Sequence, residues 1–418
     1  MTKVDEQHKN LSGKRIERVA EYNNIPIGVC NFYKREFEDY FTMENLIEAF
    51  NIASSTGRWK DSVIRYMDNW LVRMASLQTD IYNGDYTMGQ LSIFPVVKRG
   101  KRRDIRAVSF EDRIVDHVIC DNFLTAELTR SFIRENGACI KGRGVNYSMD
   151  VLRNDMAHMY KKHGLNYYVL SMDIKSFFAT IDHKYLKSVV KRHVKNPYTR
   201  EYIYNTIDIF DGDVGIGLGS QITQLLALLD LNDMDHFIKE KLRIKHYDRY
   251  MDDFYILHES KEYLEFCLNE IKLFLANIGL NLHPTKTKLF KVNSQPITFL
   301  GFKYYHTNTG RVMCEVKKDT VKRAKRKLKK LAGKYHRGEL PLSAGLQCYS
   351  AYKGHIMKGN VKSPLKGLDE YFTEQFGVSP RVKIIRHYKW KKVQDNYSGE
   401  WRWRRCMYIT KKYKGLYS

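Results

Sequence analysis

The sequence predicts an α+β fold in which helices cover an antiparallel sheet. Over residues 165–292 the predicted elements follow one another as strand, helix, helix, hairpin, helix and strand. The strand segments are rich in β-branched and aromatic residues, whereas the helical segments place apolar residues at helical spacing. A chain of 418 residues is long enough to form two or more subdomains around a sizeable core.

The first part of the chain is predicted to be mostly helical. Residues 10–60 are expected to form short helices and loops, and residues 61–85 a helix. Residues 91–110 (LSIFPVVKRGKRRDIRAVSF) predict two short strands joined by a basic turn that contains glycine. In residues 111–128 the apolar positions have helical spacing, which predicts another helix.

The middle of the chain carries the predicted sheet. Residues 165–178 (LNYYVLSMDIKSFF) follow Gly164 and predict a strand, and a helix is expected to begin near Asp182. A glycine-rich loop, DGDVGIGLGS, spans residues 211–220, and a helix with one apolar side is expected after it. Residues 243–259 (RIKHYDRYMDDFYILHE) predict two strands joined by a turn.

Residues 260–279 show the clearest amphipathic pattern, and Gly279 is well placed to cap the C-terminus of this helix. Short strands are predicted within residues 287–292 and 297–305, and a basic helix over residues 317–334. The last 58 residues are basic and rich in Trp and Tyr, and their pattern assigns them no fold.

The chain is strongly basic. It carries 71 Lys and Arg against 47 Asp and Glu, which gives a formal net charge of +24. Such an excess indicates a polyanionic partner, and no apolar run approaches the ~20 residues that span a bilayer, so nucleic acid is favoured over a membrane. The charge is clustered, with six basic residues in 98–106 and ten in 317–334.

Seven cysteines are widely scattered and form no CxxC pair. This spacing argues against a zinc ribbon and against a disulfide scaffold. The N-terminal segment MTKVDEQHKNLSGKRIERVAEYNN is polar and charged, unlike a secretory signal. We therefore expect a protein of the reducing cytoplasm.

Two adjacent carboxylates, Asp252 and Asp253, lie within the aromatic and aliphatic run HYDRYMDDFYIL. Two unit charges about 4 Å apart repel by ~4 kcal/mol at an effective dielectric near 20, so the pair needs a cation or an exposed turn. A hairpin turn that happens to contain Asp-Asp is the simpler interpretation. A third carboxylate, Asp173, ends the strand predicted within residues 165–178 and would face Asp252 if that strand lies beside the hairpin. Three carboxylates at one sheet edge suit two Mg²⁺ ions, with Mn²⁺ as the alternative.

The motifs over residues 90–305 resemble, in order, those of a reverse transcriptase. RYMDDF is similar to the YxDD box of that family, and MDIKSFF to its first metal-binding motif. RRDIRAVSFEDRIV resembles the fingers motif, GLNLHPTKTKLF the motif with a lysine near the pyrophosphate, and FLGF the primer grip. The resemblance implies a right-hand polymerase with fingers, palm and thumb, which acts as an RNA-directed DNA polymerase.

On this resemblance the chain divides into five parts. They are an N-terminal helical extension (1–60), fingers (61–165), a palm (166–310) with a fingers insertion around 183–215, a helical thumb (311–360) and a basic aromatic C-terminal extension (361–418). The basic helix falls where the thumb should grip the duplex. Five of its residues are therefore expected to bind nucleic acid: Lys322, Arg323, Lys325, Arg326 and Lys329.

The resemblance also assigns roles at the predicted sheet edge. Asp173 and Asp252 would hold the metal ions, Asp253 would complete the triad, and the backbone carbonyl of Ile174 would add a ligand. Lys286 would assist the leaving pyrophosphate as a cation or general acid.

Two further groups of residues would contact substrates. Arg103 would contact the triphosphate, with Lys101 or Lys98 as a second candidate. Contacts with nucleic acid are expected from the YxDD box and the primer grip, through Tyr250, Met251, Leu300 and Gly301.

Phe178 stands where this family places a bulky ring under the sugar, so it would exclude a 2′-hydroxyl and select deoxynucleotides by shape. A core aromatic is the simpler interpretation, and Phe177 is the alternative residue. The glycine loop departs from the family pattern, because Ile216 replaces a Gln and Gln221 follows Ser where Pro is usual. Ile216, Gly217 and Gln221 would lie at the nucleotide, and the loss of a polar contact there predicts lower fidelity.

The Ile and the Ser-Gln pair resemble diversity-generating retroelement enzymes and reverse transcriptases linked to phage defence. We expect an enzyme that copies a dedicated structured non-coding RNA from a DNA or RNA primer with dNTPs, in anti-phage defence. The alternatives are a diversity-generating retroelement enzyme, a non-catalytic RNA-binding module and protein-primed synthesis. Homo-oligomerisation is left open.

Overall fold

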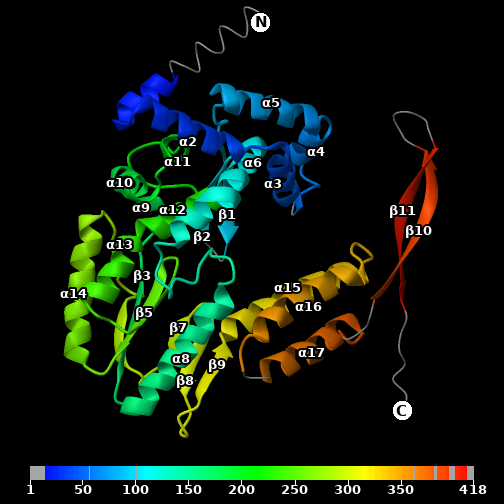
Figure 1. The fold of residues 1–418 in the computed structure, drawn as a ribbon. Helices are drawn as coiled ribbons and strands as arrows, with labels where there is room; N and C mark the ends of the chain where they lie inside the picture. The colour runs from blue at the N-terminus through cyan, green and yellow to red at the C-terminus, as the bar shows by residue number, and fades with distance from the viewer. Residues whose placement is uncertain are drawn as a thin grey trace, which may run out of the picture. The chain divides into compact units, whose positions relative to one another are not determined.

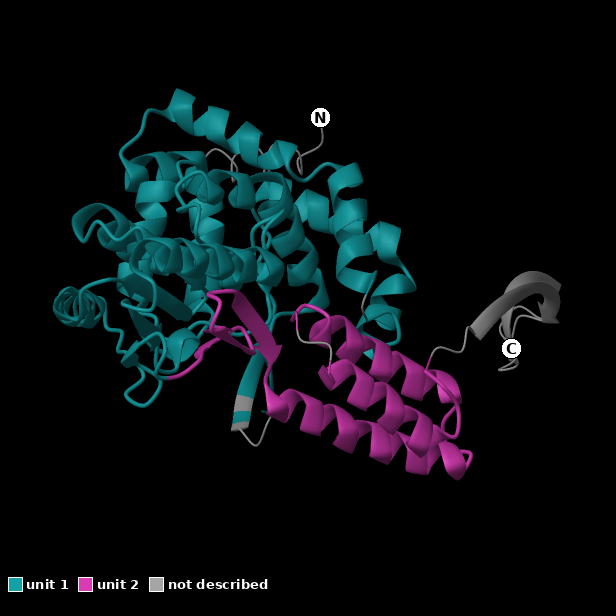
Figure 2. Cartoon of the chain, turned by 90° about the horizontal axis from the view of Figure 1, so that it is seen from below, with its two compact units in different colours: residues 1–294 teal, residues 295–418 magenta. Residues whose placement is uncertain are grey.

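The computed structural model describes residues 15–55, 57–98, 101–360, 363–380, 384–394 and 401–411. The chain forms two compact units, Met1–Ser294 (unit 1) and Gln295–Ser418 (unit 2), which Figure 2 distinguishes by colour. Both units contain helices and antiparallel strands, so the predicted α+β class is confirmed.

Unit 1 contains a four-stranded antiparallel sheet (Figure 1). In spatial order its strands are β4 (His246–Tyr250), β5 (Asp253–His258), β3 (Tyr168–Asp173) and β6 (Lys288–Lys291). The expected neighbourhood of β3 and the hairpin is confirmed, because the ladder runs from the pair Tyr168↔His258 to the pair Asp173↔Asp253. The C-terminal end of β3 therefore lies beside the turn that joins β4 to β5.

Two helices pack on this sheet. Helix α8 (Val145–His163) contacts β4 and β5, and α14 (Lys261–Asn277) contacts β3 and β5. β5 has four buried residues in a row, and β3 is buried at three of its six positions, so both central strands are largely apolar. The sheet that carries the predicted carboxylates is thus supported by the packing of α8 and α14.

The prediction for α14 is confirmed in its pattern and in its ends. Its buried row consists of Leu264, Cys267, Ile271 and Leu275. Ser260 caps the N-terminus by accepting a hydrogen bond from the backbone N–H of Tyr263 (3.0 Å). Gly279 follows the C-terminus at φ +77°, the left-handed conformation that glycine adopts most easily.

The other elements of unit 1 are a hairpin and helices. The hairpin joins β1 (Ser92–Lys98) to β2 (Lys101–Ala107), as predicted. The predicted helix over 111–128 is divided into α6 (Phe110–Ile119), a π-helical turn η1 (Cys120–Leu124) and α7 (Thr125–Thr129). The others are α2 (Ile27–Asp39), α3 (Met43–Ser55), α4 (Asp61–Met67), α5 (Trp70–Asn83), α9 (Phe177–Thr180), α10 (His183–His193), α11 (Pro197–Asp208), α12 (Gln221–Asp230), α13 (Asn232–His236) and the π-helical turn η2 (Phe237–Lys241).

Unit 2 begins with a three-stranded antiparallel sheet and continues as a bundle of three helices. The strands are β7 (Ile297–Phe299), β8 (Phe302–His306) and β9 (Val312–Val316). The helices are α15 (Lys318–His336), α16 (Leu342–Ile356) and α17 (Ser363–Phe376), and each packs on the other two. The basic helix is confirmed as α15. The bundle continues past residue 360, so α17 belongs with the helices that the sequence assigned to the thumb.

The segment to which the sequence assigned no fold also contains two strands. They are β10 (Ile384–Gln394) and β11 (Trp401–Lys411), which pair antiparallel along their whole length. In the described part of the chain, no helix is both long enough and apolar enough to cross a membrane.

Candidate active site

The two adjacent aspartates lie at a tight turn. Tyr250 pairs with Asp253 in the ladder between β4 and β5, which leaves Met251 and Asp252 as a two-residue loop. Met251 has φ +60°, in the left-handed region. A non-glycine residue held there costs about 1–3 kcal/mol, and such strain persists only when the surrounding structure fixes it.

Asp173 lies at the same edge of the sheet. The sequence predicted that it would face Asp252, but the register pairs it with Asp253 instead. Asp252 contacts the segment after β3 through its backbone. Its carbonyl accepts a hydrogen bond from the N–H of Ile174 (3.1 Å). The difference arises because Asp252 sits in the turn, one position outside the ladder. All three residues nevertheless lie together, at the end of β3 and in the turn and first residue of the adjacent hairpin strand.

Lys286 neutralises Asp173. Its ammonium donates to both carboxylate oxygens of Asp173 at 2.7 Å, while the lysine side chain remains 49% exposed. The segment that carries Lys286 is held at the end of β3, because the backbone N–H of His283 donates to the carbonyl of Asp173 (2.7 Å). Lysine and carboxylate come from distant parts of the sequence, so this pairing is a property of the fold.

The oxygen atoms available at this edge are suitable ligands for a hard divalent cation. Asp173, Asp252 and Asp253 supply carboxylate oxygens, which are the ligands that Mg²⁺ prefers. Within the described residues, no three His, Cys, Asp or Glu side chains already converge on one point as metal ligands. At Asp173 the compensating positive charge comes from Lys286. A metal ion at Asp173 would therefore take the place of an ammonium group.

The glycine-rich loop and the segment after β3 are joined by backbone hydrogen bonds. The N–H of Ile216 donates to the carbonyl of Phe178 (2.8 Å), and that of Gly215 donates to Ile181 (2.8 Å). Gly215 has φ +92°, and an added Cβ would lie 3.1 Å from the carbonyl oxygen of Ala179. The close approach of the two segments explains the need for glycine here.

Phe177 and Phe178 have different surroundings. Phe177 is 2% exposed and belongs to the core, whereas Phe178 is half-buried, with the two rings edge to face at 5.6 Å. Phe178 is thus the ring with free surface. Ile216 is 5% exposed. Its side chain packs in the core and offers little surface to a nucleotide, which differs from the position expected from the sequence.

Gly217 lies close to neighbouring elements, and Gln221 is hydrogen-bonded to one. A Cβ at Gly217 would lie 2.4 Å from the ring of Phe210 and 3.0 Å from the carbonyl oxygen of Arg106 in β2, so only glycine fits. The side-chain amide of Gln221 donates to Asp121 of η1 (2.7 Å), and both residues line a cavity of about 550 Å³. The glycine loop thus lies against β2 and Phe210, and the start of α12 is bonded to η1.

The predicted triphosphate contacts lie on the β1–β2 hairpin. Lys98 pairs with Lys101 across the turn, and Arg103 pairs with Val96. The side chains of Lys98, Lys101 and Arg103 lie outside the described part of the structure.

In unit 2, the predicted primer grip is a two-residue turn. Leu300 (φ +50°) and Gly301 (φ +88°) join β7 to β8 next to the pair Phe299↔Phe302. Positive φ at both central positions is the geometry of a type I′ hairpin turn.

The predicted nucleic-acid residues of α15 divide into two groups. Lys322, Arg326 and Lys329 are exposed. Arg323 donates to Thr320 (3.0 Å), and Lys325 lies 4.9 Å from the ring centre of Tyr371, so both of these side chains are engaged within the bundle.

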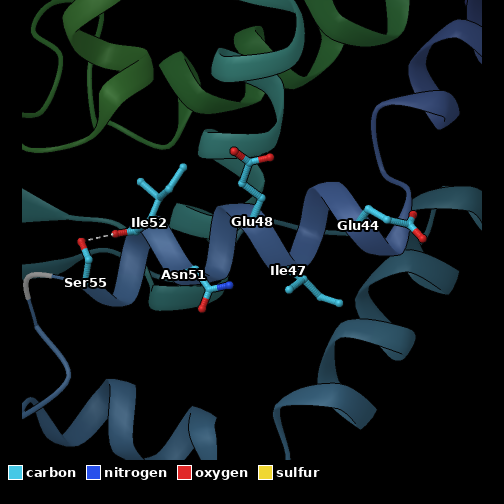
Figure 3. A pocket seen from close by; sticks show the side chains of 6 residues that line it. All are labelled: Glu44, Ile47, Glu48, Asn51, Ile52 and Ser55. Atoms are coloured by element: carbon cyan, nitrogen blue, oxygen red, sulfur yellow. Dashed lines mark hydrogen bonds between the residues drawn. The ribbon is translucent and has the colours of Figure 1, made fainter.

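A hollow of about 610 Å³ lies along α3 in unit 1. Figure 3 shows its lining, which comes from one helix: Glu44, Ile47, Glu48, Asn51, Ile52 and Ser55. It includes none of the residues that the sequence predicted for the site.

Sequence reasoning missed a buried carboxylate, Asp116 of α6. Burial raises the pKa of Asp116 to about 7, although a hydrogen bond from the Tyr202 hydroxyl (2.8 Å) acts in the opposite direction. In α6 its position is one of several on a buried face. The sequence signal was an Asp among the apolar residues Ile114, Val115, Val118 and Ile119 of that face, which also carries the buried Asp112.

This pKa predicts a pH-dependent stability. An Asp in the unfolded chain titrates near 4, so the folded state binds the proton more tightly, and stability falls as the pH rises from about 4 through 7. Asp116→Asn keeps an acceptor for Tyr202 and cannot ionise. We expect its free energy of unfolding, relative to wild type, to increase by more than about 1 kcal/mol between pH 4 and pH 8. Urea denaturation at both pH values measures this change, and parallel pH profiles would contradict it.

An antiparallel sheet with aspartates at its edge is an arrangement typical of metal-dependent nucleotidyltransferases. The family described as "Reverse transcriptase (RNA-dependent DNA polymerase)" matches residues 96–304, half of the chain. The chain therefore belongs to the reverse transcriptase family, and residues 96–304 are its reverse transcriptase (RNA-dependent DNA polymerase) domain. No curated protein matches the sequence.

Three solved structures of telomerase are similar to the chain. Telomerase from Candida albicans, in complex with a TWJ fragment of telomeric RNA, is 12% identical with a TM-score of 0.44, over 74% of this chain and 65% of that one. Apo telomerase from Candida tropicalis is 12% identical (TM-score 0.44; 69% and 62%). A form of it truncated from the C-terminal domain is 16% identical (TM-score 0.39; 52% and 53%). The chain thus spans less than two thirds of each.

Proposed function

We propose that this reverse transcriptase makes DNA on a dedicated structured RNA through Asp173, Asp252 and Asp253. The observation that carries the site assignment is the arrangement at the sheet edge, where Asp173 pairs with Asp253 and the Ile174 amide holds the Asp252 carbonyl. Two Mg²⁺ ions, or Mn²⁺, would be held by these carboxylates with the carbonyl of Ile174. When bound, they would activate the primer 3′-hydroxyl and stabilise the charge on the leaving pyrophosphate.

Lys286 has two successive tasks in this proposal. Before substrate arrives, its ammonium neutralises Asp173, as the 2.7 Å contacts show. Once another cation compensates Asp173, Lys286 is released to neutralise a phosphate oxygen or to donate a proton to the leaving pyrophosphate. Its exposed side chain allows this movement.

The charge of the chain supports an RNA partner. A net charge of +24 and the exposed residues Lys322, Arg326 and Lys329 on α15 suit a phosphate backbone. We propose that the template is a structured non-coding RNA copied from a DNA or RNA primer with dNTPs, and that the role is anti-phage defence.

A diversity-generating retroelement enzyme is the second candidate. A non-catalytic RNA-binding module is disfavoured because all three aspartates are present at one edge.

The test is nucleotide incorporation by protein that copurifies with its endogenous RNA. Mg²⁺ and all four dNTPs are supplied, the products are sequenced, and an Asp252→Ala/Asp253→Ala variant is the control. DNA complementary to one bound RNA, absent with the variant, would support the proposal and identify the template. Tight RNA binding by both proteins without incorporation would favour the binding module.

Phe178→Val should relax the choice of sugar. Phe178 has free surface and its backbone is bonded to the glycine loop, so a smaller side chain opens space without removing a core residue. We expect the preference for dNTPs over rNTPs to fall by roughly tenfold or more, measured by single-nucleotide kinetics. Phe177→Val is the matched control, since it should lower stability and leave the preference unchanged. An unaltered preference in Phe178→Val would remove Phe178 from this role.

A further inference from the structure

Arg249 is a fully buried arginine in β4, two residues before the first residue of the Met251–Asp252 turn, with 0% of its surface exposed. Its guanidinium forms a two-point ion pair with Asp235 of α13, with Nε to Oδ1 at 2.8 Å and Nη2 to Oδ2 at 2.5 Å. Asp235 is itself buried and also accepts a hydrogen bond from the Tyr247 hydroxyl (2.5 Å). Three side chains are thus fixed in one orientation inside the core.

The other donors of Arg249 act on the backbone. Nη1 donates to the carbonyl oxygen of Met251 (3.1 Å), and Nη2 donates to the carbonyl oxygen of Leu228 in α12 (3.2 Å). Met251 is the residue with positive φ in the two-residue turn. The rigid planar fork of the guanidinium therefore holds the strained peptide next to Asp252.

The backbone of Arg249 is fixed as well. Its N–H donates to the carbonyl of Glu135 (3.3 Å), and its carbonyl accepts from the N–H of Gly137 (3.2 Å). The arginine cannot shift along β4 without breaking these bonds. The turn is thus held by a group anchored at Asp235 and at the 135–137 segment.

We infer that Arg249 is a positioning residue for nucleotidyl transfer. It fixes the Met251–Asp252 peptide so that Asp252 and Asp253 stay in register with Asp173, and Asp235 and Tyr247 hold the guanidinium in place. This inference rests on the proposed function of the three aspartates. The observation that points beyond stability is the hydrogen bond from Nη1 of Arg249 to the carbonyl oxygen of Met251, the residue next to Asp252.

Arg249→Lys is the main test, because lysine keeps the charge for Asp235 but cannot reach Met251 and Leu228 from a fixed fork. Asp155→Asn is the matched control. Asp155 pairs with His246 (2.7 Å) and Tyr255 (3.0 Å) of the same sheet, away from the turn. Four quantities are measured on the full chain: thermal stability, kcat and KM on a primed template, Mn²⁺ affinity by electron paramagnetic resonance, and hydrogen exchange of the peptide spanning residues 249–254.

For Arg249→Lys we expect kcat to fall by about 10- to 100-fold, the Kd for Mn²⁺ to rise by a similar factor, and exchange in the turn to accelerate. The KM for dNTP should change little. Asp155→Asn should lower thermal stability and leave these quantities at their wild-type values. Wild-type kcat, Mn²⁺ affinity and exchange in Arg249→Lys would overturn the inference.

A second variant covers the case in which Arg249→Lys does not fold. Tyr247→Phe removes one hydrogen bond from Asp235 and keeps the arginine, so exchange in the turn should accelerate to a smaller extent. Unchanged exchange would then overturn the inference. Hydrogen exchange and Mn²⁺ affinity can be measured without turnover. If the wild-type protein fails to incorporate nucleotides, the proposed function is refuted. The effect of Arg249 on the turn and on Mn²⁺ binding is still tested by these two measurements.

Discussion

Asp252→Asn should reduce nucleotide incorporation by about 10³-fold or more. The amide keeps the shape of the side chain and removes the negative charge that a divalent cation needs. A metal ion at such a site contributes several kcal/mol of charge stabilisation in the transition state, and each 1.4 kcal/mol corresponds to a factor of ten in rate. Primer extension at saturating dNTP measures the loss as a change in kcat.

Asp150→Asn is the matched control for this experiment. Asp150 lies on α8, its side chain is exposed, and it pairs with Arg153 three residues away (2.7 Å), so the variant removes one charge from the same unit and leaves the residues of the sheet edge unchanged. Its kcat should match wild type. Activity of Asp252→Asn within tenfold of this control would show that Asp252 is not a ligand of the reacting ions.

Asp235→Ala should destabilise the protein by about 3–5 kcal/mol, the typical cost when one partner of a buried ion pair is removed. The guanidinium of Arg249 would stay buried without its counter-ion, and the hydroxyl of Tyr247 would lose its acceptor. Urea denaturation gives the free energy of unfolding directly.

The double variant Asp235→Leu/Arg249→Met is the control for the stability effect. Apolar residues of similar volume relieve the buried charge, so stability should recover to near wild type. The double variant should still be impaired in catalysis, because no group would hold the Met251 carbonyl. A loss below about 1 kcal/mol in Asp235→Ala would mean that water reaches the guanidinium.

The sheet could be predicted because its strands are short, β-branched and aromatic, and because α14 has a regular apolar row with a capping Ser and Gly. Helix α8 was missed, although Met149, Leu152, Met156 and Met159 are buried along it. Its buried face is made largely of methionine and is interrupted by charged neighbours, so the periodicity is weak. The π-helical turn η1 was missed for another reason: hydrogen bonds from residue i to i+5 are a backbone feature that the residue types of Cys120–Leu124 do not mark.

Residues of the candidate site could be predicted where they belong to one sequence motif. Contacts between residues that are far apart in the sequence could not be predicted. Asp173, Asp252 and Asp253 follow from motif order. The contact between Gln221 and Asp121 joins residues 100 positions apart, and no local pattern indicates it. Arg249 was visible within RYMDDF, but its counter-ion Asp235 belongs to a short helix with no motif. The burial of Ile216 likewise depends on how the glycine loop packs, which sequence alone does not determine.

The contact between Lys286 and Asp173 has a consequence for the order in which ligands bind. A divalent ion at Asp173 must displace the ammonium, and the displaced ammonium then favours a triphosphate nearby. A bound triphosphate that attracts Lys286 likewise leaves Asp173 open to the ion. The two ligands are therefore thermodynamically linked, and each should raise the affinity of the protein for the other by the same factor. The resting enzyme would bind free metal weakly and take it up together with the nucleotide.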